Sequence, residues 1–228
     1  MKRKHKVRGF FLAAIICIGA LAAFKAKAIP RRVVKTLTTR ELERNWGKEA
    51  AKRILASFER HLEELKGDGI EASGVMRFHL FSARQGLALY RALTEELGDR
   101  ESAVEATHQV IWNAFLKTPF RISGSMLGRA KDPFAACVRN LELRDPRIFP
   151  SPGWEREIVE VENGWGKDYK KCFYYDYFND KGAPELTPAF CEVDFKQAGY
   201  FPSQIEFCRT KTLATGGDLC DFRFYHRD

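Results

Sequence analysis

The chain has 228 residues, of which 45% are hydrophobic and 13% aromatic, values of a folded protein that exclude general disorder. Its net charge of +8 is unevenly distributed, because residues 1–35 hold ten basic and no acidic side chains. Residues 36–228 therefore carry 28 basic and 30 acidic side chains. This near-neutral body lacks the positive excess that binding to a phosphate backbone requires, so we expect no nucleic-acid partner.

The first predicted element is an uncharged run of sixteen residues, Gly9 to Phe24, with basic residues on both sides. A transmembrane helix needs about 17–25 apolar residues, and this run reaches that length if the flanking lysines extend to the membrane surface. We therefore expect a single-pass membrane anchor through residues 9–24. Two alternatives stay open, a peripheral helix and a signal peptide that is cleaved near Ala26-Lys27-Ala28 to give an exported protein. The basic flanks leave the orientation in the membrane open.

Apolar residues at helical spacing predict several helices after this segment. The first opens at a capping box, Thr38-x-x-Glu41, and ends at Gly67. The segments predicted to follow are a helix at 75–97, a helix at 101–117, a loop at 124–128 and a short helix at 134–141. His79 and His108 lie on apolar helical stripes, and we interpret both as core residues with hydrogen-bonded rings.

The pattern changes after Pro152, where short alternating segments begin. The predicted elements are a strand near Ile158 to Val161, a turn at Asn163-Gly164, a strand at 171–178, a helix from Thr187 and a closing hairpin around Gly216-Gly217. This order predicts an α+β fold, with N-terminal helices packed on a mainly antiparallel sheet with one inserted helix, preceded by the hydrophobic segment. We divide the chain into an anchor or signal segment at 1–35 and a single domain at 36–228.

Six cysteines occur without a C-x-x-C pair or a neighbouring histidine, so the sequence predicts no metal site. One lies in the apolar N-terminal run, which leaves an odd number for the domain. A full disulfide framework is therefore disfavoured, although one bridge stays open if the domain is exported. The sequence leaves the cofactor and the oligomeric state undetermined.

Cys191 and Asp194 are the first candidate catalytic pair. If Thr187 is the N-cap, Cys191 lies one turn into its helix, where the helix dipole favours a thiolate. Asp194 follows three residues later on the same face, where it can act as a base or orient a water. The competing interpretation is that Cys191 packs as a small buried hydrophobe.

The closing hairpin concentrates polar side chains near this pair. A turn centred on Gly216-Gly217 places Thr212 opposite Asp221 and Arg209 opposite Phe224. Alternation then gives a packed face with Ile205, Phe207, Cys220, Phe222 and Phe224, and a polar face with Cys208, Thr210, Thr212, Asp221, Arg223 and Tyr225. The alternative is an exposed edge hairpin with solvated charges.

Cys172 is the second candidate thiol, at the start of the aromatic segment Phe173-Tyr174-Tyr175. The preceding pair Lys170-Lys171 would lower the pKa of a thiol. Strand alternation could equally bury it.

Taken together, these motifs resemble the L-2-amino-thiazoline-4-carboxylic acid hydrolase family. The resemblance covers roughly residues 40–226 and is specific in the last sixty. Its motifs are Ala88-Leu89-Tyr90-Arg91-Ala92-Leu93, Pro184-Glu185-Leu186-x-Pro188-x-x-Cys191-x-x-Asp194 and Arg209-Thr210-x-Thr212-Leu213-Ala214-x-Gly216-Gly217-Asp218-x-Cys220-Asp221-Phe222-Arg223-Phe224. The Gly-Gly-Asp-x-Cys-x-Phe ending is also similar to vinyl-4-reductase-type binding domains, which implies a shared sheet-and-helix pocket.

The resemblance implies hydrolysis of a small cyclic amidine to a carbamoyl-cysteine, on the route to cysteine. Arg209 or Arg223 would bind the substrate carboxylate, and Asp194 or Asp221 the amidine. The amidine carbon would be attacked by a cysteine thiolate or by an activated water. Cys191 is the first choice of nucleophile and Cys172 the second. Thr212 joins the candidate substrate-binding set.

Two other functions remain open. A non-catalytic sensor or binding module tethered to the membrane could use the same pocket. In a structural membrane-associated protein, the cysteines would be plain core residues.

Overall fold

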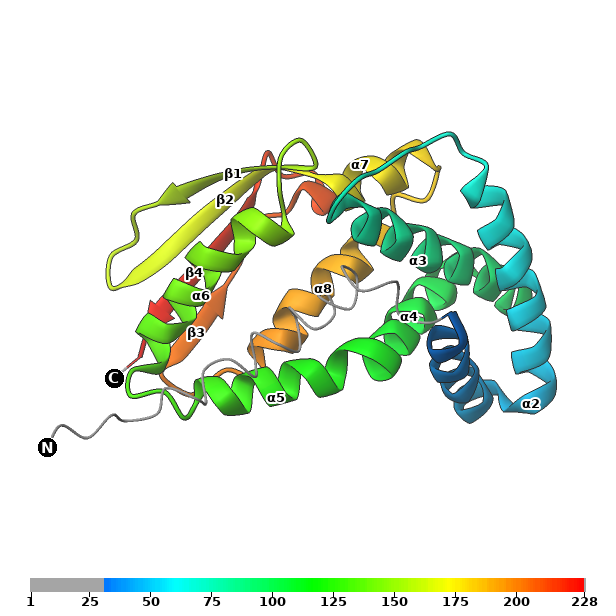
Figure 1. Cartoon of the computed structure of the whole chain (residues 1–228), viewed down its shortest axis with the longest axis horizontal. Coiled ribbons are helices and arrows are strands. Elements are labelled where there is room, and N and C mark those ends of the chain that lie inside the picture. Colours follow the sequence, from blue (N-terminus) through cyan, green and yellow to red (C-terminus); the bar gives the residue numbers. More distant parts are fainter. Residues whose placement is uncertain (1–30, 228) are drawn as a thin grey trace, which may run out of the picture.

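The computed structural model describes residues 31–227 (Figure 1). The apolar run at residues 9–24, predicted to be a membrane anchor, lies outside the described residues. Within residues 31–227, no helix combines the length and the apolar character that crossing a membrane requires.

The first half of the described chain is helical. Its elements are α2 (Arg31–Lys66), α3 (Met76–Leu97), α4 (Arg100–Ile111), a π-helical turn (Trp112–Leu116), α5 (Lys117–Leu127) and α6 (Pro133–Ile148). The predicted second helix is confirmed as α3, which ends at Gly98 in the left-handed conformation, φ 70°. Helix α3 packs against α2 and α4, and Leu87, Ala88 and Leu93 on it are fully buried in the largest hydrophobic core.

Helix α2 begins well before the predicted capping box, so the box is wrong as a helix start. Thr38 and Glu41 are buried inside the helix, and Glu41 instead accepts a hydrogen bond from Asn113 Nδ2 at 2.8 Å. The helix is interrupted at Gly47, whose φ of 77° and ψ of 170° are not helical. A positive φ of this kind is available to glycine at little steric cost.

The third predicted helix is longer than expected, because the chain stays helical through the π-turn and α5. Pro119 is the third residue of α5 and directly follows the π-helical turn. The loop predicted at 124–128 is wrong, since Gly124 lies inside α5, where the backbone of Tyr200 passes close to it. The short helix predicted at 134–141 is confirmed and extended to α6, whose N-cap Asp132 accepts from Ala135 N at 2.8 Å.

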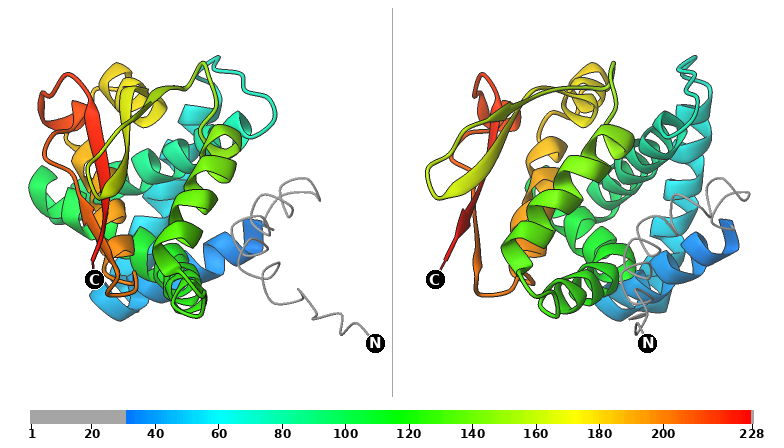
Figure 2. Two further views of the ribbon diagram at one scale, coloured as in Figure 1. Left: turned by 90° about the vertical axis from the view of Figure 1, so that its left-hand side faces the viewer. Right: turned by 60° about the vertical axis from the view of Figure 1, so that its left-hand side comes forward.

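The second half forms an antiparallel four-stranded sheet in the order β1-β2-β4-β3. Its strands are β1 (Trp154–Val159), β2 (Gly164–Cys172), β3 (Ile205–Cys208) and β4 (Cys220–His226). Asn163, with φ 54°, makes the predicted turn between β1 and β2. The α+β fold is therefore confirmed, and Figure 2 shows the sheet at one side of the helical body.

Two helices, α7 (Phe173–Asp180) and α8 (Leu186–Ala198), separate β2 from β3. The strand predicted at 171–178 is therefore wrong beyond Cys172, and the predicted inserted helix is α8. The closing hairpin is also corrected: β3 ends at Cys208, and a loop with a short 3-10 turn, Leu213–Thr215, connects it to β4. Arg223 lies opposite Cys208, and Phe224 lies opposite Phe207 rather than Arg209.

Candidate functional site

The inner face of the sheet, which α6 and α8 cover, carries the candidate site. Residue alternation on β2 and β4 turns alternate side chains toward this face. Trp165 pairs with Phe224, Lys167 with Phe222, and Tyr169 with Cys220. Phe207 of β3 and Phe195 of α8 also meet on this face, with ring centroids 5.3 Å apart. The predicted packed face of the closing strands is thereby confirmed.

A buried lysine lies among these aromatic residues. The Lys167 ammonium forms an ion pair with Asp145 of α6 and donates to the Tyr169 hydroxyl at 3.3 Å. Its Nζ is 5.0 Å from the ring centroid of Tyr169 and 5.1 Å from that of Phe222. Lys167 is 4% exposed. A cation this deeply buried needs a paired carboxylate, and the surrounding rings add cation–π attraction.

A second ion pair lies against the same aromatic face. Arg209 follows β3, and its Nη1 donates to Asp194 of α8 at 2.6 Å. Its Nη2 donates to the Cys191 carbonyl at 3.1 Å, and its guanidinium carbon lies 5.3 Å from the Phe222 ring centroid. The Arg209 side chain is 4% exposed and that of Asp194 is 35% exposed. The structure thus brings together Cys191, Asp194 and Arg209, three of the predicted site residues.

The buried Nε of Arg209 has no hydrogen-bond partner among the described residues. An unpaired donor of this kind is costly in the interior of a protein. Arg209 therefore keeps an unused donor beside its carboxylate partner, and Asp194 keeps an exposed edge.

Ionisation at Asp194 and Cys191 is governed by burial. Burial raises the pKa of the Asp194 carboxyl, while Arg209 and Lys167 act to lower it. Burial also raises the pKa of the Cys191 thiol, and the Asp194 carboxylate raises it further. A thiol in this environment is protonated at neutral pH, and a carboxylate of raised pKa is a stronger base than usual.

The predicted N-cap at Thr187 is wrong, which changes the setting of Cys191. Helix α8 begins at Leu186, after Glu185 in a helical conformation, and the buried Thr187 lies inside its first turn. Cys191 therefore lies in the second turn of the helix. The helix dipole and the free N–H groups act within the first turn, so they do not assist a thiolate at Cys191.

Cys172 is the last residue of β2 and the N-cap of α7. It packs in an aromatic cluster with Trp154, Tyr169 and Cys220. Burial raises the pKa of its thiol to about 11, against the hydrogen bonds from the start of α7. All five described cysteines are free thiols. The charge of a Cys172 thiolate would raise the pKa of the Cys191 thiol further.

The remaining predicted binding residues hold the loop and the outer face of the sheet. Asp221 accepts from the Thr210 and Lys211 backbone N–H groups at 2.9 and 2.7 Å, and from the Thr210 hydroxyl at 2.6 Å. Burial alone would raise the pKa of Asp221, but these hydrogen bonds lower it. Thr212 caps the 3-10 turn by accepting from Thr215 N.

Arg223 points to the face of the sheet opposite Arg209. It pairs with Asp168 at 2.7 Å and donates to the Lys167 carbonyl at 3.2 Å. The strand register places Arg223 opposite Gly166, on the face that Val159 and Val161 share. The structure therefore does not bring Arg223 together with Cys191 and Asp194.

Sequence reasoning missed Lys167, Asp145 and Tyr169. A signal was present in the alternation of Trp165, Lys167 and Tyr169, which turns a lysine to the same face as two aromatic residues. Asp145 offered no such signal, because the helix predicted from the sequence ended at residue 141, before Asp145. No group of three or more metal-ligating side chains is found within residues 31–227.

The two histidines interpreted as core residues differ. His79 is buried and its ring is bonded on both sides, by the Tyr174 hydroxyl at 3.0 Å and the Ile148 carbonyl at 2.6 Å. The interpretation of His79 as a core residue is confirmed. His108 is half-buried, and its Nε2 has no hydrogen-bond partner among the described residues.

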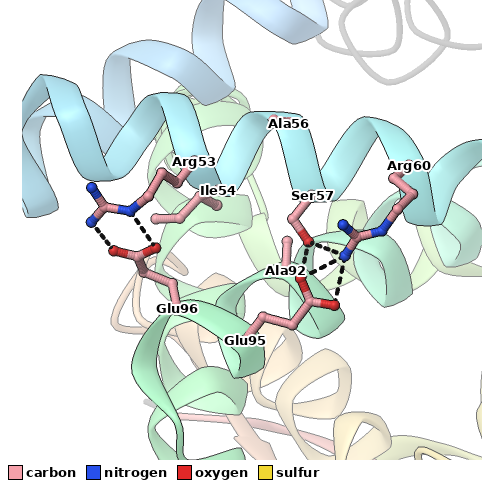
Figure 3. Close-up of a pocket in the computed structure, with 8 residues that line it drawn as sticks. All are labelled: Arg53, Ile54, Ala56, Ser57, Arg60, Ala92, Glu95 and Glu96. Carbon is pink, nitrogen blue, oxygen red and sulfur yellow. Dashed lines mark hydrogen bonds and ion pairs between the residues drawn. The ribbon is translucent and has the colours of Figure 1, made fainter.

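A surface groove between α2 and α3 is a separate feature, of about 410 Å³ (Figure 3). Its charges pair with one another: Arg53 with Glu96, and Arg60 with Glu95 at 2.6 Å. Hydrogen bonds lower the pKa of Glu95 to about 2. The bond from Ser57 has the largest effect, and those from Arg60 and His61 add to it. We interpret the groove as a set of ion pairs that joins α2 to α3.

A family model described as "L-2-amino-thiazoline-4-carboxylic acid hydrolase" matches residues 76–224, more than half of the chain, and includes both buried ion pairs. No curated protein matches the chain.

Among solved structures, an H-NOX protein from S. oneidensis in the Fe(II)NO state is 12% identical, with a TM-score of 0.42, over 86% of this chain and 98% of that one. An unliganded H-NOX mutant from K. algicida is 16% identical, with a TM-score of 0.39, over 86% and 96%. With TM-scores this low, neither likeness carries an argument.

Proposed function

Because the chain belongs to the L-2-amino-thiazoline-4-carboxylic acid hydrolase family, we propose that it hydrolyses a small cyclic amidine at the ion pair of Arg209 and Asp194. In the reaction, water adds to the carbon between the ring sulfur and nitrogen, and the ring opens to a carbamoyl-cysteine. The observation that carries the proposal is the ion pair itself: a buried guanidinium with an unused donor, against a carboxylate that reaches solvent.

The charges of this pair complement those of the substrate class. A 2-amino-thiazoline-4-carboxylate has a carboxylate at one end of its ring and a protonated amidine at the other. Its carboxylate matches the fork of Arg209, including the free Nε, and its amidinium matches Asp194. On binding, the substrate would exchange the contact between Arg209 and Asp194 for one contact with each residue, so neither charge is left unpaired in the interior.

We assign the attack to a water molecule that Asp194 activates. The raised pKa of Asp194 supports this role, because a general base is most effective when its pKa approaches the working pH. The raised pKa of the Cys191 thiol disfavours direct attack by a thiolate. In this proposal Cys191 positions Arg209 through its carbonyl, and its thiol is the second candidate for the nucleophile, ahead of Cys172.

The test is hydrolysis of 2-amino-thiazoline-4-carboxylate by the purified full-length chain, followed by mass spectrometry of the carbamoyl-cysteine product. We expect Asp194→Asn to lower kcat about 100-fold or more, because it removes the base. Arg209→Lys should mainly raise KM, since a lysine cannot form the bidentate contact. Asp218→Asn is the matched control, because Asp218 is an exposed carboxylate that pairs with Lys211 at 3.1 Å.

A Cys191→Ala variant separates the two nucleophiles. If water attacks, the variant keeps its activity within about tenfold, because the carbonyl that holds Arg209 is retained. Complete loss of turnover with a folded protein would instead assign the attack to the thiol.

A wild-type chain that binds the compound in calorimetry without turning it over would contradict hydrolysis and favour a binding or sensor role.

A further inference from the structure

Lys167 is a buried charge that the proposed reaction has not yet used. It occupies a strand position between Trp165 and Tyr169, on an otherwise aromatic face. Replacing a buried ion pair by well-packed hydrophobic residues is often neutral or stabilising. The fold alone therefore gives weak grounds for a lysine here, whereas a reaction on this face gives a specific one.

The pair formed by Lys167 and Asp145 and the pair formed by Arg209 and Asp194 contact the same aromatic ring, that of Phe222. The Phe222 ring joins them, because Lys167 Nζ lies 5.1 Å and the Arg209 guanidinium carbon 5.3 Å from its centroid. The two pairs also act on each other electrostatically: Lys167 lowers the pKa of Asp194, and Asp145 raises it. A ring bound beside Asp194 would therefore feel the charge of a second cation, the Lys167 ammonium.

Ring opening is assisted by a proton donor as well as by a base, because the leaving heteroatom gains an electron pair. Arg209 cannot give up a proton in a protein. Burial raises the pKa of the Cys191 thiol and of the Tyr169 hydroxyl, so both hold their protons tightly. The Lys167 ammonium is a further proton-bearing group of this face, and it already donates to the Tyr169 hydroxyl.

We propose that Lys167 donates the proton to the ring heteroatom that leaves when the cyclic amidine opens, an inference that rests on the proposed function. Water gives its proton to Asp194, and its oxygen bonds to the amidine carbon. The carbon–sulfur bond then breaks, its electron pair goes to sulfur, and sulfur takes a proton from Lys167 Nζ. The hydroxyl proton of the intermediate returns to Lys167 as the carbonyl forms, and Asp194 releases its proton to solvent through its exposed edge.

The experiment compares two substrates that differ in the leaving atom, 2-amino-thiazoline-4-carboxylate and 2-amino-oxazoline-4-carboxylate. The full-length wild-type chain, Lys167→Arg and Lys167→Met are measured on both. Arginine keeps the cation beside Asp145 but cannot donate its proton. Lys170→Met is the control, because Lys170 lies on the same strand, faces solvent and pairs with Glu157 at 2.5 Å. Circular dichroism and thermal melting of each variant report folding.

An alkoxide is a much stronger base than a thiolate, so its departure depends more on a proton donor. We expect Lys167→Arg to lower kcat/KM for the oxazoline about 100-fold or more, and for the thiazoline about tenfold or less. Equal losses on both substrates in the folded Lys167→Arg variant would overturn the inference and leave Lys167 a structural residue. If the wild-type chain hydrolyses neither substrate, the proposed function fails and this inference fails with it.

Discussion

His79 is a neutral side chain held at the junction between the helices and the sheet. Its ring lies 4.5 Å from the Trp154 ring centroid and bonds to Tyr174 and Ile148. Burial lowers the pKa of His79 to about 4, although the bond to the Ile148 carbonyl acts the other way. A histidine kept neutral in the fold makes the stability of the whole domain depend on pH.

We predict that the free energy of unfolding decreases as the pH falls from 6.5 towards 4. In this range the unfolded state binds a proton at His79 and the folded state does not, so acid favours unfolding. The contribution is present above pH 6.5, and its loss is at most about 3 kcal/mol by pH 4. Urea unfolding at pH 7, 6 and 5 measures it.

The matched variant is His79→Gln, which keeps a polar side chain but does not titrate. Its unfolding curves should shift less between pH 7 and 5 than those of the wild type. An equal shift in both proteins would assign the acid sensitivity to other groups.

At the scale of elements, the contact between α5 and the chain after α8 depends on a glycine, Gly124, which has no side chain to separate the two backbones. A Cβ at Gly124 would collide with the Tyr200 carbonyl, while a Cβ at Gly128 would meet the Gly124 carbonyl oxygen at an ordinary 3.6 Å. We predict that Gly124→Ala destabilises the protein by about 1–3 kcal/mol, because a backbone must move to admit the methyl group. Chemical denaturation with Gly128→Ala as the control tests this, and equal stability of the two variants would contradict it.

Helix α3 and the turn at Asn163 were predictable because each depends on a local signal, helical periodicity for one and turn-forming residues for the other. The aromatic segment after Cys172 was misread because five of the six residues at 173–178 are aromatic, so the pattern supports either period. In the structure, Phe173 stacks on Tyr177 and Tyr174 on Phe178, the four-residue spacing of a helix. Strand alternation and helical spacing cannot be separated in such a segment without its tertiary partners.

The candidate site was predictable in part. Cys191, Asp194 and Arg209 stand in the motifs that carry the family resemblance, and the structure brings them together. Thr212 and Asp221, which stand in the same motifs, instead make hydrogen bonds within the loop. The reason is that β3 ends before Arg209 and the predicted hairpin register does not form. Asp145 could not be predicted, since its contact with Lys167 joins residues that are 22 positions apart through the packing of α6 on the sheet.

At the scale of the whole molecule, the positive charge lies almost entirely in the N-terminal segment, and the domain is nearly neutral. We propose that residues 9–24 attach the domain to a membrane. The double variant Ile15→Asp, Ile16→Asp should then move the protein from the membrane pellet to the supernatant in carbonate extraction. Each acidic side chain costs about 2.5–3.5 kcal/mol at the centre of a membrane-spanning helix.

Val33→Asp is the control, because it places a new acid on an exposed side chain of α2 outside the run. Recovery of the wild-type chain in the supernatant would contradict the anchor. An intact mass that lacks the first residues would favour the signal peptide instead.

The hydrogen bonds that Asp221 accepts from the loop after Arg209 affect the thermodynamics of ligand binding. Its three hydrogen bonds fix Thr210 and Lys211, the two residues that directly follow Arg209. Ordering a residue's backbone costs about 1–2 kcal/mol of configurational entropy. In the Arg209 loop this entropy is lost when the protein folds, and burial of the hydrophobic core offsets the loss. A ligand therefore binds a guanidinium that is already held in place. Its affinity is not reduced by a loss of conformational entropy in the Arg209 loop.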